Sequence, residues 1–396
     1  MPDVLGYLLL SAFSFVLVLS VVVFVHELGH FQVARWRGVA IDTFSIGFGK
    51  TLLGWRDKQG VQWKVGALPL GGYVKFADDA DAMSTGPREK NDDPQAMAEA
   101  RAKGLFHAQP LSTRAMVVAA GPVTNFVFSI LAFAAIALIM GRDATDYANV
   151  PARISAVAEA SPAAAAGLQA GDVVLSIDGR AIANFTEFQA AVAAAPEQAL
   201  TFQIERDGVR STISATPRRE GARGLIGVYG PLVLDSERQI ERYGPISAIG
   251  AGAANTWDIV AKTGEYIGAI FAGRESGDQI AGPVGIFNVS GQVASSALSG
   301  GPSDGGGLLP RLGLLALSLL SLAAVLSVAV GIVNLLPIPI LDGGHLLFYA
   351  IEGARGGKPL PAVAQEWAYR AGFAVMASLF LFATWNDITR LLPGAQ

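Results

Sequence analysis

Four long uncharged stretches constrain this chain more than any other feature of its sequence. A helix that crosses the hydrocarbon core of a bilayer needs roughly 20 apolar residues. Three stretches are long enough, and the fourth, of 16 residues, lies among the aromatic side chains typical of a membrane interface. The stretches cover residues 5–25, 115–141, 312–341 and 371–386. We therefore predict an α-helical membrane protein with about four transmembrane helices.

The composition supports this prediction and excludes other classes of protein. Hydrophobic residues make up 52% of the chain and charged residues only 16%, which argues against a purely cytosolic enzyme. The net charge of -4, without a basic cluster, argues against nucleic acid as a partner. The chain has no cysteine, so disulfides, thiolate nucleophiles and thiolate metal ligands are all excluded. The first apolar stretch has no positive charge ahead of it and no small-residue cleavage site, so we expect it to be retained as a span rather than removed as a signal peptide.

The distribution of positive charge predicts how the spans are oriented. Residues 31–114 contain twelve lysines and arginines, whereas the six residues ahead of Tyr7 contain none. Because positive loops mark the cytoplasmic side, we expect the N-terminus outside, residues 31–111 in the cytoplasm and residues 142–311 outside. The first and third spans then both run inward. Their ends, near residues 26 and 340, are expected at the same membrane face.

The polar regions predict two folded parts on opposite sides of the membrane. Short β-prone runs between residues 44 and 76 are broken by glycines and predict a cytoplasmic-side region of small β-hairpins, with Gly47-Phe48-Gly49 in a re-entrant hairpin. This hairpin either presents a strand edge to a bound segment or anchors the chain in the bilayer. On the other side, the pattern S-P-A-x-x-A-G-L-x-x-G-D within residues 150–220 resembles the PDZ domains of bacterial membrane proteases. We expect an extracytoplasmic α+β PDZ-like domain that either binds an extended peptide or acts as a spacer.

The segment 221–311 is expected to link this domain to the third span. Around Trp257, apolar residues fall on one helical face and charged residues on another, which predicts an amphipathic helix. Such a helix either lies on the lipid surface or packs inside a second soluble subdomain.

The strongest chemical signal lies at the inner end of the first span. His26-Glu27-Leu28-Gly29-His30 is an H-E-x-x-H motif, and histidines four residues apart share one face of a helix. Both imidazoles can therefore bind one Zn²⁺, while the glutamate between them accepts a proton from the water that attacks the substrate. We expect a zinc site at the end of residues 1–30.

A catalytic zinc usually has three protein ligands, so a third must come from elsewhere in the chain. The first and third spans are expected to end at the same membrane face, so we look for this ligand at the end of the third span, residues 312–345. Asp342 is the only carboxylate between residues 312 and 350. Pro337 and Pro339 are expected to break the helix just before it. His345, three residues later, is the competing ligand, although the two glycines between them weaken the argument that they share a helical face.

These motifs together resemble the site-2 proteases, zinc metalloproteases that cut transmembrane segments within the membrane. The likeness rests on the H-E-x-x-H motif, on N-x-x-P-x-x-x-L-D-G from Asn334, and on further motifs that include G-P-x-x-N from Gly121 and G-P-V-G-I from Gly282. It is strongest for the bacterial regulator-of-sigma-E protease type, which has four spans, here 1–30, 112–141, 312–345 and 368–390. That type carries two PDZ domains, whereas this sequence shows one.

The resemblance implies a set of roles and partners. His26, His30 and Asp342 would bind Zn²⁺, Glu27 would be the catalytic base, and Asn334 would lie near the substrate backbone. Gly47, Phe48, Gly49 and Pro337 would contact substrate. The substrates would be single-span proteins of the bacterial inner membrane, cut during regulated signalling such as anti-sigma factor cleavage, with the lipid bilayer as surroundings.

Two other functions remain open from the sequence. A non-proteolytic membrane scaffold with a PDZ-like domain would explain the spans, but not the H-E-x-x-H motif that topology pairs with Asp342. A zinc protease that acts on soluble peptides outside the membrane would explain the motif, but it needs the site on the opposite face.

Overall fold

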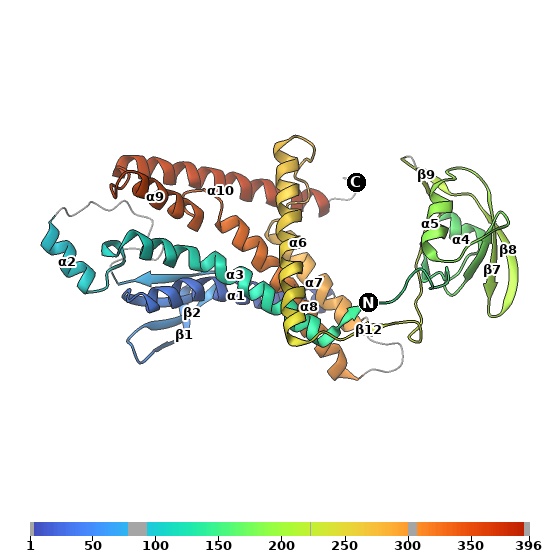
Figure 1. Ribbon diagram of the computed structural model, residues 1–396, viewed down its shortest axis with the longest axis horizontal. Helices are drawn as coiled ribbons and strands as arrows, with labels where there is room; N and C mark the ends of the chain where they lie inside the picture. The colour runs from blue at the N-terminus through green and yellow to red at the C-terminus, as the bar shows by residue number, and fades with distance from the viewer. Residues whose placement is uncertain (1–3, 78–92, 222, 300–306, 392–396) are drawn as a thin grey trace. The chain divides into compact units, whose positions relative to one another are not determined.

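The structure is a computed structural model that describes residues 4–77, 93–221, 223–299 and 307–391. The chain divides into two compact units (Figure 1). The first, called the helical unit below, comprises Met1–Ile139 and Gly244–Gln396; the second, the inserted unit, is Met140–Tyr243.

Four helices of the described chain are long and apolar enough to cross a membrane, as the sequence predicted. They are α1 (Val4–Trp36), α3 (Leu111–Met140), α8 (Leu308–Asn334) and α10 (Ala362–Leu391). The last helix is much longer than the apolar run of 16 residues. Its first turns carry the charged pair Glu366 and Arg370, one turn apart, and so do not count toward an uncharged stretch. An uncharged stretch therefore marks the existence of this helix and underestimates its length.

Five further helical elements complete the described part of the helical unit. They are α2 (Pro94–Ala102), the 3₁₀ turn η1 (Phe106–Ala108), α6 (Pro245–Phe271), α7 (Pro283–Ser299) and α9 (Asp342–Ala354). Helix α7 packs against α1 and α8, where Ala294 joins Val18, Val22 and Leu319 in a buried cluster. Small residues allow helices to approach closely in an apolar surrounding. The expected amphipathic helix is part of α6, and Gly252 of α6 packs directly on the backbone of α3.

The small β-hairpins expected between residues 44 and 76 form one long pair of strands. β1 (Ile41–Arg56) pairs with β2 (Gln62–Phe76), with several bulges. Phe44 pairs with both Trp63 and Val74, so the first half of β1 is flanked by both halves of β2. Aromatic side chains of α1, the hairpin and η1 pack beneath it: Phe31, Phe44, Phe76 and Phe106 are buried in one cluster. The hairpin is thereby fixed to α1.

A break between α8 and α9 places the start of α9. Helix α8 ends at Asn334, and α9 begins at Asp342, so the interruption falls where Pro337 and Pro339 predicted it. The connecting segment folds back onto the first turn of α9. Cβ atoms added at Gly343 and Gly344 would collide with carbonyl groups of that segment, so only glycine fits at these two positions. This close approach fixes the position of Asp342 relative to the end of α8.

The inserted unit is built around an antiparallel sheet of order β6-β5-β7-β8, with buried side chains that include Phe188, Phe202, Ile154 and Ile204. Its elements are β3 (Arg142–Asp143), β4 (Ala156–Val157), α4 (Pro162–Ala166), β5 (Val173–Ile177), β6 (Arg180–Ala181), α5 (Phe185–Ala193), β7 (Leu200–Arg206), β8 (Val209–Ala215), β9 (Arg218–Glu220), β10 (Arg223–Leu225), β11 (Val228–Tyr229) and β12 (Ile240–Glu241). The unit extends past residue 220, because β11 pairs with β4 and β12 with β3. Its PDZ-like character stays a prediction.

Candidate metal centre

A cavity of about 390 Å³ lies inside the helical unit. Its walls come from α1, β2, η1, α3, the break between α8 and α9, α9 itself and α10. Its lining includes all four histidines of the chain and three carboxylates, Glu27, Asp342 and Glu352. Among the lining residues are His26, Glu27, His30, Gly72, Tyr73, Val74, Phe76, His107, Arg114, Asn334, Asp342, His345, Tyr349, Glu352 and Tyr369. Elements far apart in sequence thus meet around one space.

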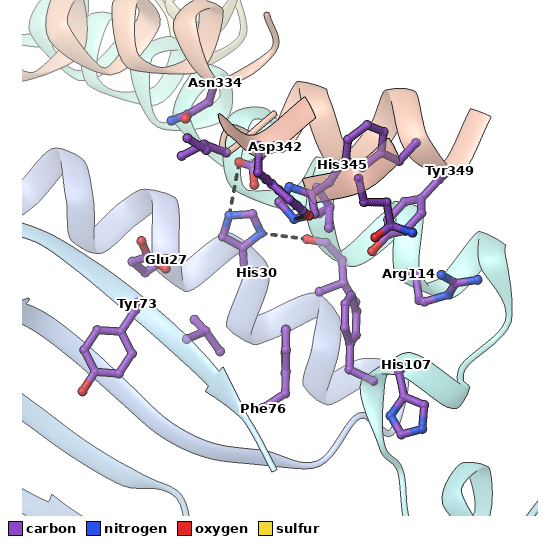
Figure 2. Close-up of a pocket in the computed structure, with 18 of the residues that line it drawn as sticks. Glu27, His30, Tyr73, Phe76, His107, Arg114, Asn334, Asp342, His345 and Tyr349 are labelled. Carbon is purple, nitrogen blue, oxygen red and sulfur yellow. Dashed lines mark hydrogen bonds and ion pairs between the residues drawn. The ribbon is translucent and has the colours of Figure 1, made fainter. Parts of the chain in front are cut away.

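Two imidazoles and one carboxylate converge at one wall of this cavity. His26 and His30 lie one turn apart on α1, with ring centroids 4.8 Å apart. Asp342 Oδ2 lies 3.2 Å from His26 Nε2 and 3.4 Å from His30 Nε2. Figure 2 shows the His30 ring between Asp342 and a backbone carbonyl, with Asn334 near Asp342. The first turn of α9 therefore supplies the third group of a cluster that α1 begins.

The chemistry of these three groups fits a metal ion. The Val117 carbonyl can only accept, so the 2.9 Å contact with His30 Nδ1 places the ring hydrogen on Nδ1 and leaves a lone pair on Nε2. Asp342 Oδ2 is buried and accepts no hydrogen bond of good geometry from any described residue. One donor atom from each residue lies within 4.8 Å of the others. Two nitrogens and one oxygen are a ligand set that Zn²⁺ accepts, with a further position left for substrate or water.

Glu27 lies beside this cluster, where β2 passes α1. Gly72 of β2 allows the approach: a Cβ atom at that position would lie 2.9 Å from Glu27 Cγ. Tyr73 and Val74 continue the wall on the same strand. The carboxylate of Glu27 and a stretch of β-strand thus face one cavity.

Other residues of the cavity lining form fixed polar pairs. Arg114 Nη2 donates to Glu352 Oε1 at 2.6 Å, and the Arg114 guanidinium lies 4.9 Å from the centre of the Tyr349 ring. Burial raises the pKa of Tyr349 to about 12, so its phenol stays neutral. His345 Nδ1 contacts the Leu341 carbonyl at 3.1 Å, and its Nε2 lies 3.4 Å from the Tyr369 hydroxyl. Both nitrogens of His345 therefore have partners away from the metal cluster.

The structure brings together most of the residues that the sequence singled out. His26, Glu27, His30, Asn334 and Asp342 all line the cavity. The remaining predicted substrate contacts lie outside its lining: Gly47, Phe48 and Gly49 on β1, and Pro337 in the break before α9. Phe48 contacts a lining residue, because its ring stacks on that of Tyr73 with the ring centroids 6.0 Å apart.

Several residues at the centre were missed by the reasoning from sequence. The strand segment 72–76 was expected as part of a hairpin, without a position at the cavity. Asn125, whose carboxamide lies 3.2 Å from His26 Nδ1, was noted only as part of the G-P-x-x-N motif. A signal for it exists: Val117, Gly121 and Asn125 are spaced four apart, which places them on one face of α3.

Comparisons with known proteins agree with this site. The description "Peptidase family M50" matches residues 14–379. A Rhizobium meliloti protein that carries the name zinc metalloprotease is 41% identical over 387 residues and covers 96% of both chains. An Agrobacterium fabrum protein with the same kind of name is 40% identical over 396 residues, 98% of each chain. The metalloprotease MmpA of Caulobacter vibrioides is 40% identical over 398 residues, 98% of this chain and 97% of its own.

Proposed function

Because this chain belongs to peptidase family M50, the zinc metalloproteases of the site-2 type, we propose that it hydrolyses peptide bonds within or near the transmembrane segments of single-span membrane proteins. The observation that carries the proposal is the meeting of His26, His30 and Asp342 beside Glu27, in a cavity walled by membrane-length helices. A protease that acts only on soluble peptides does not need its site between such helices.

In this function each residue of the cluster has a distinct role. His26, His30 and Asp342 hold the zinc. When bound, the ion supplies a Lewis acid that polarises the scissile carbonyl and lowers the pKa of a water molecule. The Glu27 carboxylate accepts a proton as the water oxygen bonds to the carbonyl carbon, and it returns the proton to the amine nitrogen when the C–N bond breaks. The Asn334 carboxamide, at the end of α8, donates to the peptide or to the oxygen on which negative charge develops.

The substrate must be unwound before it is cut, because a helix keeps its carbonyls in internal hydrogen bonds. Residues 72–74 of β2 pair with residues 44–46 of β1 on one side, and no described strand pairs with them on the other. This part of the strand lines the cavity beside Glu27. An extended substrate segment that pairs with it would bring its peptide bonds to the metal cluster. In this proposal β2 is the strand that contacts the substrate, and Gly47–Gly49 lie on the neighbouring strand β1.

The cellular setting follows from charge and from the family. The protease lies in the bacterial inner membrane with residues 31–111 and the metal centre toward the cytoplasm, and with the N-terminus and the PDZ-like domain outside. The inserted unit binds an extended peptide and restricts which substrates reach the site, in regulated signalling such as anti-sigma factor cleavage. A non-proteolytic scaffold would not explain why His26, His30 and Asp342 converge beside Glu27.

The test of this function uses the purified chain in lipid vesicles with a panel of single-span substrates. Wild-type protein should produce fragments whose ends lie within or near the substrate span, and a chelator should stop their formation. Cuts confined to soluble loops would contradict an intramembrane site.

Sidedness needs a separate measurement, which the cysteine-free chain permits. Exposed Lys58 and Arg210 are replaced one at a time by cysteine. An impermeant thiol reagent should label Arg210→Cys in intact cells and Lys58→Cys only after lysis. The reverse pattern would overturn the proposed orientation.

A further inference from the structure

One face of α3 supports both imidazoles of the metal cluster. Val117 accepts from His30 Nδ1, and four residues later Gly121 leaves the space in which both rings sit. A Cβ atom at Gly121 would collide with the His30 ring and would lie 2.8 Å from His26 Cε1. Four residues further, the Nδ2 atom of the Asn125 carboxamide lies 3.2 Å from His26 Nδ1. Val117 and Asn125 therefore contact the Nδ1 atoms of the two rings, the nitrogens that point away from the proposed metal.

We propose that Asn125 is the positioning residue of His26, and that its Oδ1 accepts the hydrogen of His26 Nδ1. This bond selects the ring tautomer whose Nε2 carries a lone pair. The proposal rests on the proposed function, in which His26 is a zinc ligand. It gives His26 the same support that the Val117 carbonyl gives His30.

The two ends of the carboxamide have opposite consequences for the ring. If Nδ2 faces the ring, His26 Nδ1 must accept and the ring hydrogen lies on Nε2, in the place of the metal. If Oδ1 faces the ring, Nδ1 donates and Nε2 is free. The two ends fill nearly the same volume, and a half-turn of the carboxamide exchanges them. Oδ1 has no hydrogen-bond partner among the described residues, so it is available to accept.

The hydrogen-bond count does not choose between these orientations, because one end of the carboxamide is paired in either case. The position of His26 Nε2 decides, since it lies 3.2 Å from Asp342 Oδ2 in the metal cluster. A hydrogen on that nitrogen would exclude it from binding zinc. Only the orientation with Oδ1 toward the ring is therefore compatible with a ligand role for His26.

The surroundings hold Asn125 rigidly in place. The residue is fully buried, and its backbone carbonyl accepts from the hydroxyls of Ser129 at 3.0 Å and Ser327 at 3.1 Å. Ser327 belongs to α8, so Asn125 is anchored between two helices. The same contacts mean that a change at Asn125 could act through packing, and Ser327 offers a control: its hydroxyl contacts the backbone of Asn125 and not the carboxamide.

The experiment compares zinc retention in purified, zinc-loaded full-length variants that are challenged with a chelator. Asn125→Leu keeps the side-chain volume and removes both polar ends; it should hold zinc about 10- to 100-fold less tightly. Asn125→Asp keeps an acceptor for Nδ1 and should retain zinc near the wild-type level, with a wild-type visible spectrum after cobalt substitution. Ser327→Ala should retain zinc as wild type does. Thermal unfolding checks that each variant is folded, and Asn125→Ala replaces the leucine variant if leucine does not fit.

Each outcome tests a different statement. Wild-type retention in Asn125→Leu or Asn125→Ala would overturn the positioning role. Equal weakness in folded Asn125→Leu and Asn125→Asp would show that the residue acts as a donor or through packing, and would overturn the acceptor role. His26→Ala serves as the reference: if it retains zinc fully, the proposed ligand set fails, whereas loss of zinc there with normal retention in Asn125→Leu defeats only this inference.

Discussion

Arg114 and Glu352, 238 positions apart in the sequence, form a two-pronged ion pair inside the helical unit. Arg114 Nη2 donates to Oε1 at 2.6 Å and Nη1 to Oε2 at 3.3 Å, with side chains only 17% and 12% exposed. Arg114 lies in the first turn of α3, the helix that contacts both histidines, and Glu352 lies in α9, the helix that begins with Asp342. The pair therefore ties the imidazole side of the metal centre to the carboxylate side.

Removal of one partner should destabilise the protein strongly. Arg114→Met or Glu352→Met leaves an unpaired buried charge, which costs about 3–5 kcal/mol in soluble proteins. The double variant, Arg114→Met with Glu352→Met, leaves no such charge and should unfold at a higher temperature than either single variant. Thermal unfolding in detergent measures this order. Equal losses that add in the double variant would show that the two side chains do not act as a pair.

Gly121 should be intolerant of even one additional carbon. Because a Cβ atom there meets both imidazole rings, Gly121→Ala should displace the rings and lower the zinc content of the purified protein. Gly313→Ala is the matched control: it also changes a glycine of a membrane-length helix, but the added atom meets nothing within 4 Å. The control should be neutral, or stabilise the helix by about 0.5–1 kcal/mol. Normal zinc content in Gly121→Ala would contradict the placement of the rings.

The third zinc ligand should be Asp342 rather than His345. Asp342→Asn removes the charge from the group nearest both Nε2 atoms and should weaken zinc retention and activity sharply. His345→Ala should keep the metal, because both ring nitrogens of His345 already have other partners. Elemental analysis of the two purified variants distinguishes the ligands. Zinc lost from His345→Ala and held by Asp342→Asn would reverse the assignment.

Asp387 should hold the start of α7 against α10. Its Oδ1 accepts from the Gly282 amide at 3.0 Å and its Oδ2 from the Gly285 amide at 2.9 Å, and the residue is 3% exposed. Asp387→Ala would leave two amides without acceptors, at about 1–3 kcal/mol each. Hydrogen exchange in residues 283–299 should therefore accelerate.

The control for this variant is Thr384→Ala, which removes only a hydroxyl bonded within α10 at an exposed position. It should leave exchange in α7 unchanged. Similar exchange in α7 for wild type and Asp387→Ala would mean that the carboxylate does not cap this helix.

The convergence of His26, His30 and Asp342 could be predicted because its signals are local or topological. The spacing of His26 and His30 places them on one helical face, and the parity of the spans brings Asp342 to the same end, where the structure also finds it. Both signals can be read from the sequence without knowledge of tertiary packing. The break before Asp342 was equally accessible, because two prolines within three residues, Pro337 and Pro339, disfavour a continuous helix.

The supporting contacts could not be predicted in the same way. Arg114 with Glu352 and Asn125 with His26 join residues 238 and 99 positions apart, and no periodicity specifies such pairs. The β-hairpin was expected, but the position of Gly72 and Tyr73 at the cavity depends on how β2 packs on α1. Register and docking come from tertiary contacts that a sequence pattern does not contain.

The central claim is that Glu27 performs the proton transfers of a zinc peptidase without holding the metal. The direct test measures zinc content and cleavage of a single-span substrate on the same preparation of Glu27→Gln. We predict one zinc per chain, as in wild type, with cleavage at least about 10²-fold slower, because the amide keeps the shape of the side chain and cannot accept the proton. Wild-type cleavage by the zinc-loaded variant would contradict the account.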